Sequence, residues 1–507
     1  MKARLERVSA AMTAAVGALC GIFALNDLAI GVFQDDGHYA ILARALATGH
    51  GYHYTNLPGA PAATHFPPGY PLLLAPLWWI APSFPGNVAV LKLLNVVLLA
   101  VAAVAIRAVA RRLGGLSPLA ASMLAMVSVA TVPVLFLSGL LFSEIAFIAA
   151  LCGVLLVAEP VVAHEDASWR RVLGVGVAIG ALAMLRTVGV TLLPAVLAVL
   201  LWRRRWQASA LVLAGACVFL VPWQLWSAAH ARDVSSAIAG AYGAYGTWLT
   251  DAWRAGGAPF VRDVLLENLR GLRMLLMLFG LYDAPLWARA MATLALVTLV
   301  ASGAWALRRR APVTVLLFVP YVALLLLWPF PPDRFLWPLW PFTVMLAVAG
   351  ARALSETSRP AAVRRGARVL AASLAVLLAV WHVRTWPGRS WEEMSRTNAR
   401  VGRAAAGVVL ALPADGLVAS DQDAMVALYA NRQAVPLVAL TAEQHVRARS
   451  DEEVSRQIAG VLDAYHPRWV LVVQRESLRG ATLLQKAGRL HLMGADPSGV
   501  IVYDVLR

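Results

Sequence analysis

Charged side chains are scarce in this chain. They make up 14% of its 507 residues, whereas 60% of the residues are hydrophobic and the mean hydropathy is +0.68. Soluble domains carry about a quarter charged residues, so an ordinary soluble protein is excluded. Apolar windows of about 17–25 residues, the length that crosses a hydrocarbon core, recur over most of the chain. The composition therefore predicts a polytopic membrane protein.

Acidic residues are scarcer than basic ones: the chain has 28 Asp and Glu against 44 Lys and Arg, and its net charge is +16. A surplus of this size could indicate a nucleic-acid partner. The arginines, however, occur in short clusters between apolar spans, which is the positive-inside pattern of membrane proteins. We therefore expect membrane lipids, and no nucleic acid, as partners.

Cysteine is rarer still. Cys20, Cys152 and Cys217 each lie in an apolar segment without metal-ligand spacing, so we interpret them as inert packing residues. His50 and His53 have no further ligand nearby and do not make a convincing metal site. The sequence predicts no cofactor firmly and leaves a divalent metal requirement open. Internal repeats and low-complexity segments are also lacking.

The basic clusters predict the topology. Those assigned to the cytoplasm are Arg107 to Arg112, Arg170 and Arg171, Arg203 to Arg205, Arg308 to Arg310, and the segment Arg352 to Arg368. Between them we predict eleven spans, at residues 8–32, 86–107, 117–137, 140–158, 172–185, 187–202, 208–228, 285–307, 312–328, 335–354 and 368–386. The first apolar run is too long for a cleaved signal peptide. The basic clusters and the odd number of spans thus predict an inner (plasma) membrane protein with a cytoplasmic N-terminus and an extracytoplasmic C-terminus.

Three segments are predicted outside the cytoplasm: a first loop at 33–85, a second at 229–285 and a C-terminal region at 387–507. The last is charged and alternates short β runs ("GLVASD", "RWVLVVQ" and "GVIVYDV") with helical patterns, which predicts a small α/β domain. The expected fold is thus mainly α, a helical bundle over residues 1–386 followed by this domain.

Two adjacent carboxylates, Asp35 and Asp36, follow the first span. The apolar pattern after them predicts an amphipathic helix that lies in the membrane interface and ends at "TGHG", with Asp36 as its N-cap. Successive helical residues point about 100° apart, so both acids cannot cap. Asp35 is left free where an unpaired carboxylate is unfavourable unless it has a task. The "PLLLAPLWW" that follows is too short to span and predicts an interfacial or re-entrant element.

These segments resemble a known family. The first loop reads "DDGHYAILARALATGHGY" and then "HFPPGYPLLLAPLWW", and later segments read "LSGLLFSEIAFIAAL", "GALAMLRTVGVTLLPAVL", "VPWQLW" and "DRFLWPLWPF". Together they are similar to polytopic glycosyltransferases of the GT-C fold, and more narrowly to the family 39 group. That group includes protein O-mannosyltransferases and the lipid A aminoarabinose transferase. The first-loop motif is the most specific part of the resemblance.

The resemblance implies an enzyme of the cell envelope, a hexosyl- or pentosyltransferase that takes its sugar from a polyprenyl-phosphate donor. The acceptor is a protein, lipid or glycan. The catalytic base maps onto Asp35 and, less directly, Asp36, although the commoner family pair is Asp-Glu. Glu144 matches a second family acid. His65 stands where some relatives carry an acidic-basic pair. The resemblance therefore does not support a contact with a metal or with the donor phosphate at this position.

Each remaining candidate has a local alternative. Arg186 and Arg334 could bind the donor phosphate; Arg186 could instead snorkel at a helix end, and Arg334 could pair with Asp333. Glu144 could be a helix-start acid satisfied by the dipole. His65 could be structural, and Tyr39 could line a cavity or pack at the interface.

Two other classes of function stay open. A flippase or transporter would also place Arg and Glu in its spans, but the chain shows no repeat between halves. A non-catalytic scaffold would need no acidic pair. A membrane glycosyltransferase, inverting and with an Asp general base, is the preferred hypothesis.

Overall fold

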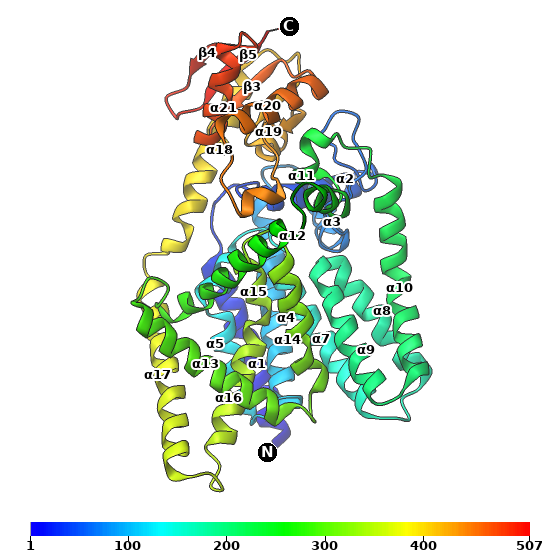
Figure 1. Ribbon diagram of the computed structural model, residues 1–507, viewed down its shortest axis with the longest axis vertical. Coiled ribbons are helices and arrows are strands. Elements are labelled where there is room, and N and C mark those ends of the chain that lie inside the picture. The colour runs from blue at the N-terminus through cyan, green and yellow to red at the C-terminus, as the bar shows by residue number, and fades with distance from the viewer. Residues whose placement is uncertain (1, 507) are drawn as a thin grey trace.

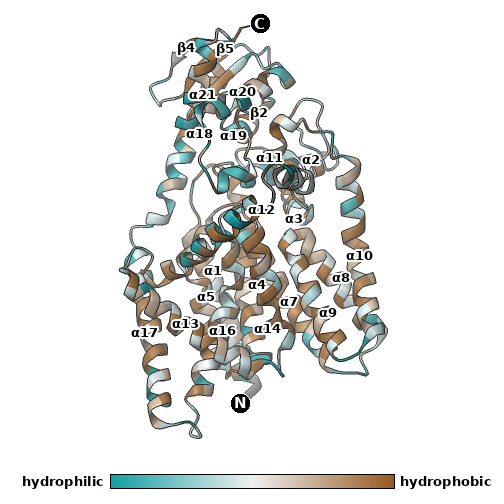
Figure 2. Ribbon diagram, in the orientation of Figure 1, coloured by the Kyte–Doolittle hydropathy of each residue, from teal (hydrophilic) through white to brown (hydrophobic). Residues whose placement is uncertain are grey.

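The computed structural model describes residues 2–506. A helical bundle forms one part of an elongated molecule and a smaller domain with a sheet forms the other, with the N-terminus and C-terminus at opposite ends (Figure 1). Hydrophobic residues dominate the bundle, whereas the smaller domain is richer in hydrophilic residues (Figure 2). The predicted combination of a mainly helical bundle and a small C-terminal sheet domain is confirmed.

The bundle and its loops contain helices of very different length. They are α1 (Lys2–Ala24), α2 (Asp35–Ala47), α3 (Gly69–Ile80), α4 (Val88–Arg112), α5 (Pro118–Val129), α6 (Val132–Gly139), α7 (Glu144–Ala163), α8 (Trp169–Leu185), η1 (Thr187–Thr191), α9 (Leu192–Trp202), α10 (Trp206–Ala229), η2 (Ser236–Ile238), α11 (Ala239–Tyr242), α12 (Tyr245–Gly271), η3 (Leu272–Phe279), α13 (Leu286–Leu307), α14 (Pro312–Leu327), α15 (Asp333–Leu336), η4 (Trp337–Leu339), α16 (Trp340–Leu354) and α17 (Ala361–Thr385). Here η denotes a 3₁₀ segment.

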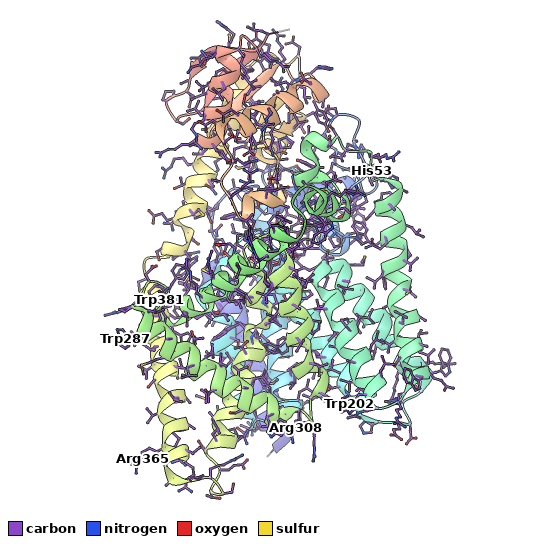
Figure 3. All side chains as sticks on the ribbon, in the orientation of Figure 1. His53, Trp202, Trp287, Arg308, Arg365 and Trp381 are labelled. Atoms are coloured by element: carbon purple, nitrogen blue, oxygen red, sulfur yellow. The ribbon has the colours of Figure 1, made fainter. Side chains whose placement is uncertain are left out.

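Within residues 2–506, seven helical segments are long and apolar enough to cross a membrane, or eight if α5 and α6, bent by 61°, form one span. The predicted count of eleven is not confirmed. Helices do occur at the remaining predicted positions, but α8, η1 with α9, and α14 are shorter. Arg308 and Arg365 lie at the end of the bundle away from the C-terminal domain, the end to which the topology assigns the cytoplasm (Figure 3).

The first predicted span, 8–32, extends too far, because α1 ends at Ala24. The side-chain oxygen of Asn26 accepts hydrogen bonds from the Leu28 backbone N–H and from Lys92 Nζ. Side chains that bond to nearby backbone in this way compete with the helical ladder. The chain therefore leaves the helix and continues, at the end of the bundle that faces the C-terminal domain, toward α2.

Helix α2 is not the amphipathic helix that the sequence predicts. Its residues from Asp36 to Ala43 are all buried, and a helix that is buried all round belongs in a protein interior. It packs on α3 and on α19 (Asp423–Tyr429) of the C-terminal domain. A Cβ on Gly37 would come within 2.7 Å of the Ala424 Cβ, so only glycine permits this approach.

The C-terminal domain holds a five-stranded sheet in the order β2-β1-β3-β5-β4. Its elements are η5 (Ser390–Glu392), α18 (Glu393–Ala411), β1 (Val418–Ser420), α19, β2 (Ala434–Pro436), η6 (Ala442–His445), α20 (Asp451–Tyr465), β3 (Trp469–Val472), α21 (Arg475–Lys486), β4 (Leu490–Ala495) and β5 (Ile501–Val505). β1 runs parallel to both β2 and β3, whereas β5 is antiparallel to β3 and β4. The domain sits on the loops at one end of the bundle (Figure 1).

Candidate functional site

A strained turn precedes α2. Gln34 has φ 59° and ψ −59°, a backbone region that favours glycine, and the Asp35 N–H donates to the Phe33 carbonyl across it at 2.5 Å. This is a γ-turn of the rare, strained kind. Strain of this kind persists only where the surroundings fix it, and it is concentrated at functional sites. The turn places Asp35 at the very start of the helix.

Asp36 fixes this turn. Its carboxylate accepts hydrogen bonds from the Gly31 N–H at 2.8 Å and from the Phe33 N–H at 3.0 Å. The predicted N-cap role is therefore wrong, because Asp36 lies in the first turn of α2 and bonds backward to the loop before it. Burial raises the pKa of Asp36 although the two N–H donors oppose that change. The side chain is turned away from solvent and supports the turn that carries Asp35.

Asp35 begins a chain of four charges. Arg334 Nη2 lies 2.5 Å from Asp35 Oδ2, and Arg334 Nε lies 2.9 Å from Glu144 Oε1. Arg186 Nη1 lies 2.9 Å from the same Glu144 oxygen. We refer to Asp35, Arg334, Glu144 and Arg186 as the ionic chain. The two carboxylates balance the two guanidinium groups.

The ends of the ionic chain differ in exposure. The Glu144 side chain is fully buried, whereas those of Asp35 and Arg334 are each 26% exposed. Arg186 also donates to Ser143 Oγ at 2.9 Å, and the Tyr39 hydroxyl lies 3.2 Å from that oxygen. Glu144 therefore orients the two arginines from behind, and Asp35 is the acid within reach of a substrate.

The structure rejects the local alternatives for the two arginines and decides between the two given for Tyr39. Arg334 pairs with Asp35 and Glu144, and Arg186 is 7% exposed and ion-paired, which is not a snorkelling arginine. Glu144 is the first residue of α7, but its carboxylate pairs with two arginines. Tyr39 is buried beside Ser143 and lines a cavity. Apart from Asp36 and His65, the predicted set thus converges on one place.

Two cavities meet at Asp35 and Arg334. The larger one, about 580 Å³, is lined near Asp35 by His38, His65, Tyr245 and Trp328. Asp333 and Arg334 also line it. Its other residues are apolar and come mainly from α6, η3, η4 and the start of α18; they include Phe136, Leu137, Met274, Met277, Trp337 and Met394. The large cavity therefore offers neutral polar and aromatic groups beside the carboxylate and an apolar surface farther away.

The smaller cavity, about 160 Å³, lies on the other side of the ion pair. Arg186 and Arg334 both line it, together with Thr187. The rest of its lining is mainly apolar and includes Tyr39, Pro67, Val188, Val190, Leu324 and Leu325. The small cavity combines two fixed cations with a surface suited to a hydrocarbon chain.

The ionisation states suit these surroundings. Burial would raise the pKa of Asp35, but the charge and the hydrogen bond of Arg334 outweigh it and hold that pKa below its usual range. Burial lowers the pKa of His38 to about 3, and it also lowers the pKa of His65, against the Gly243 hydrogen bond. At neutral pH the large cavity therefore contains an ionised Asp35 beside two neutral imidazoles.

His65 does not lie among the arginines. Its Nδ1 lies 2.7 Å from the Gly243 carbonyl oxygen, and its ring packs on Tyr245 with centroids 4.1 Å apart. Because it is neutral and tied to the second loop, it supplies no fixed positive charge for a phosphate. It forms part of the wall of the large cavity.

Reasoning from the sequence missed His38. This side chain is 1% exposed, its ring lies 4.4 Å from that of Tyr242, and neither ring nitrogen has a hydrogen-bond partner within residues 2–506. Its position three residues after Asp35 would have placed both on one face of a helix. A buried imidazole without partners, lining the cavity that contains Asp35, is available to a ligand.

The part of the chain that the structure describes contains no group of three or more His, Cys, Asp or Glu side chains arranged to hold a metal ion. His50 and His53 lie apart from the ionic chain: His50 Nδ1 bonds to Thr48 and His53 Nδ1 to the His50 carbonyl. The cysteines are free.

No protein-family model and no curated protein sequence matches this chain. Solved structures do. ArnT from Cupriavidus metallidurans, bound to undecaprenyl phosphate, superimposes with a TM-score of 0.57 at 13% identity, over 98% of this chain and 97% of that one. The chain has the GT-C fold. The apo form of the same ArnT gives a TM-score of 0.58 at 12% identity.

A second GT-C protein supports this assignment. The archaeal oligosaccharyltransferase AglB from Archaeoglobus fulgidus, in complex with an inhibitory peptide and a dolichol-phosphate, gives a TM-score of 0.53 at 13% identity. The likeness covers 98% of this chain and 74% of AglB. Identities this low establish the fold alone, so what the protein does has to be argued from its own residues.

Proposed function

We propose that this protein is a membrane glycosyltransferase that moves a sugar from a polyprenyl-phosphate donor to an acceptor hydroxyl. The observation that carries the proposal is the position of Asp35. Its carboxylate lines both a small cavity with two guanidinium groups and a larger cavity that shares only Arg334 with it and adds Asp333 and neutral polar groups. A base between an anionic leaving group and a neutral nucleophile is what such a transfer requires.

The donor phosphate fits the small cavity. Arg186 and Arg334 present fixed cations there, and guanidinium groups bind phosphate oxygens in pairs of hydrogen bonds. The aliphatic lining beside them suits the polyprenyl chain. The solved ArnT and AglB structures contain undecaprenyl phosphate and dolichol-phosphate, respectively, which supports a polyprenyl phosphate as the ligand class.

The acceptor hydroxyl then approaches from the large cavity. Arg334 engages Asp35 Oδ2, so we assign Oδ1 as the oxygen that takes the hydroxyl proton. The acceptor oxygen forms a bond to the anomeric carbon while the bond from that carbon to the phosphate oxygen breaks. The proton ends on Asp35, and the electron pair leaves with the polyprenyl phosphate. A single displacement of this kind inverts the anomeric centre.

The ionic chain has a second task in this scheme. Negative charge grows on the leaving phosphate, and cations held in place beforehand stabilise it without reorganising. Glu144 holds both guanidinium groups in position through Oε1. Because Arg334 touches Asp35 as well, it keeps that carboxylate ionised and ready to accept a proton.

The proposal is tested by supplying the purified protein, in lipid nanodiscs, with a polyprenyl-phosphate-linked sugar. The sugar is chosen by mass spectrometry of the lipids that co-purify with the wild type. We expect release of polyprenyl phosphate that depends on an acceptor extract and is lost in Asp35→Asn. Donor that crosses the bilayer unchanged would instead support a flippase.

A further inference from the structure

A third cavity lies behind the γ-turn, at the edge of the C-terminal sheet. Its volume is about 440 Å³, and it is lined by Gly31–Gln34 from the first loop, by Asn398 from α18 and by residues that directly follow β1 and β3. β1 and β3 are parallel neighbours, and the chain leaves β1 for β2 on one side and returns as β3 on the other. Ligands of open α/β sheets bind at such a switch point, outside the carboxyl ends of the strands.

The polar groups of this switch-point cavity fall into two sets. The carboxylates are already occupied: Asp421 accepts hydrogen bonds from the Val473 and Gln474 N–H groups and from Ser477 Oγ, and Asp423 accepts one from the Tyr242 hydroxyl. The side chains of Gln34 and Gln422 are half-buried and that of Gln474 is exposed, and none of the three amides makes a side-chain hydrogen bond within residues 2–506. The free hydrogen-bonding capacity is therefore neutral.

This lining selects among ligand classes. No Lys, Arg or His is among the described residues that line the cavity, so it offers nothing to a phosphate. A cation would find both carboxylates already engaged. Each amide offers a carbonyl oxygen and an NH₂ group, which together accept from and donate to hydroxyl groups. A neutral compound rich in hydroxyls, a carbohydrate, matches the three amides.

The switch-point cavity adjoins the catalytic centre. Phe33 and Gln34 line both this cavity and the large cavity that contains Asp35. The C-terminal domain contacts the segment that leads into this turn. Gly31 packs against Met425 so closely that a Cβ on it would lie 2.7 Å from Met425 Cγ, and the Ile30 N–H donates a hydrogen bond to the Tyr429 hydroxyl at 2.9 Å. A ligand held there contacts the segment that positions the base.

We infer that the switch-point cavity, lined by Gln34, Gln422 and Gln474 beside the γ-turn, binds a neutral carbohydrate portion of the acceptor. This inference deepens the proposed function and rests on it in one respect, namely that the bound carbohydrate belongs to the acceptor of the transfer. The binding of carbohydrate itself is independent of catalysis. It gives the C-terminal domain the task of recognising the acceptor at a point remote from the reacting hydroxyl.

Binding is measured on the full chain in nanodiscs by saturation-transfer-difference NMR. The probes are maltotriose, mannotriose and chitotriose, with a Gly/Ser pentapeptide as the other class of ligand. We expect at least one trisaccharide to bind the wild type. In Gln422→Ala/Gln474→Ala its Kd should rise about tenfold or more, as the loss of one or two hydrogen bonds predicts.

Gln485→Ala is the matched control, because Gln485 lies exposed on α21 outside the cavity and its loss should leave binding unchanged. Gln474→Trp, which fills the cavity, tests the site a second way, and thermal unfolding of every variant verifies that it is folded. The inference is overturned if no trisaccharide binds, if both cavity variants bind as the wild type does, or if the pentapeptide alone binds. Donor turnover on the same samples is read separately, so its failure would reject the proposed function and leave the binding result standing.

Discussion

The two cavities that meet at Asp35 are built from different chemistry. The small one holds Arg186 and Arg334 with an aliphatic lining, whereas the large one holds neutral histidines and aromatic rings beside the carboxylate. The difference separates the demands of the reaction. In the proposed reaction, the arginines of the small cavity stabilise the charge that grows during transfer, and the large cavity orients an uncharged nucleophile. Changes to each wall should therefore affect different substrates.

The largest effect is expected from Glu144→Ala. This change leaves the buried Arg186 and the partly exposed Arg334 without their shared carboxylate, and removal of one partner of a buried ion pair destabilises proteins by about 3–5 kcal/mol. We expect a lower thermal unfolding temperature in detergent and loss of donor turnover. Glu356→Ala, on the exposed turn after α16, is the control. A variant with normal stability and turnover would show that Glu144 does not organise the arginines.

Arg186→Ala tests the small cavity alone. Loss of a fixed cation at a developing charge lowers rates by about 10²–10³-fold, so we expect kcat/KM for the donor to fall within that range. Arg186→Lys should recover part of it. KM for the acceptor should hardly change. If the defect appears in acceptor KM and spares the donor, the assignment of the two cavities is reversed.

Arg334→Gln tests the residue that both cavities share. Arg334 lowers the pKa of Asp35, so its removal should raise that pKa. The base must be ionised, and the acid limb of the pH profile of residual activity should therefore move to higher pH. Arg334→Lys, which keeps a positive charge, should move it less. An unshifted acid limb in Arg334→Gln would mean that Asp35 is not the group whose ionisation limits the rate.

The smallest effect is expected from His38→Phe in the large cavity. The ring keeps its packing on Tyr242 but loses both nitrogens. Loss of one neutral hydrogen bond predicts a rise in acceptor KM of about threefold to tenfold. His50→Phe, in the first loop outside both cavities, is the control. A rise confined to donor KM would place the acceptor elsewhere.

The sequence predicted the site better than it predicted the path of the chain. Asp35, Glu144, Arg186 and Arg334 are far apart along the chain. They were expected in one site chiefly because of the family resemblance, with support from the rule that charged residues in so apolar a chain need partners or tasks. His38 was missed, although its spacing from Asp35 placed it on the same helical face. The role of Asp36 could not be foreseen, because it depends on the positive φ of Gln34, and a glutamine at that position gives no sequence signal for a positive φ.

The errors in the fold also have physical causes. Helix α2 was expected to be amphipathic, but the C-terminal domain packs on it and it is buried all round, and a contact of that kind depends on distant sequence. β1, β3 and β5 were read correctly from their apolar runs. β2 was missed because Ala434–Pro436 is three residues long, and β4 because five of its six residues are exposed. The first span was overextended because hydropathy does not register the Asn26–Lys92 contact.

The most direct test of the account compares two adjacent carboxylates, Asp35→Asn and Asp36→Asn, in single-turnover transfer from a polyprenyl-phosphate sugar. General-base catalysis contributes about 10²–10⁴-fold, so Asp35→Asn should be slower by that factor while unfolding like the wild type. Asp36→Asn should lose about 1–3 kcal/mol of stability, as a weakened buried hydrogen-bond acceptor does, and its folded fraction should keep most of the rate. If Asp36→Asn abolishes the chemical step and Asp35→Asn does not, the central claim that Asp35 is the base is contradicted.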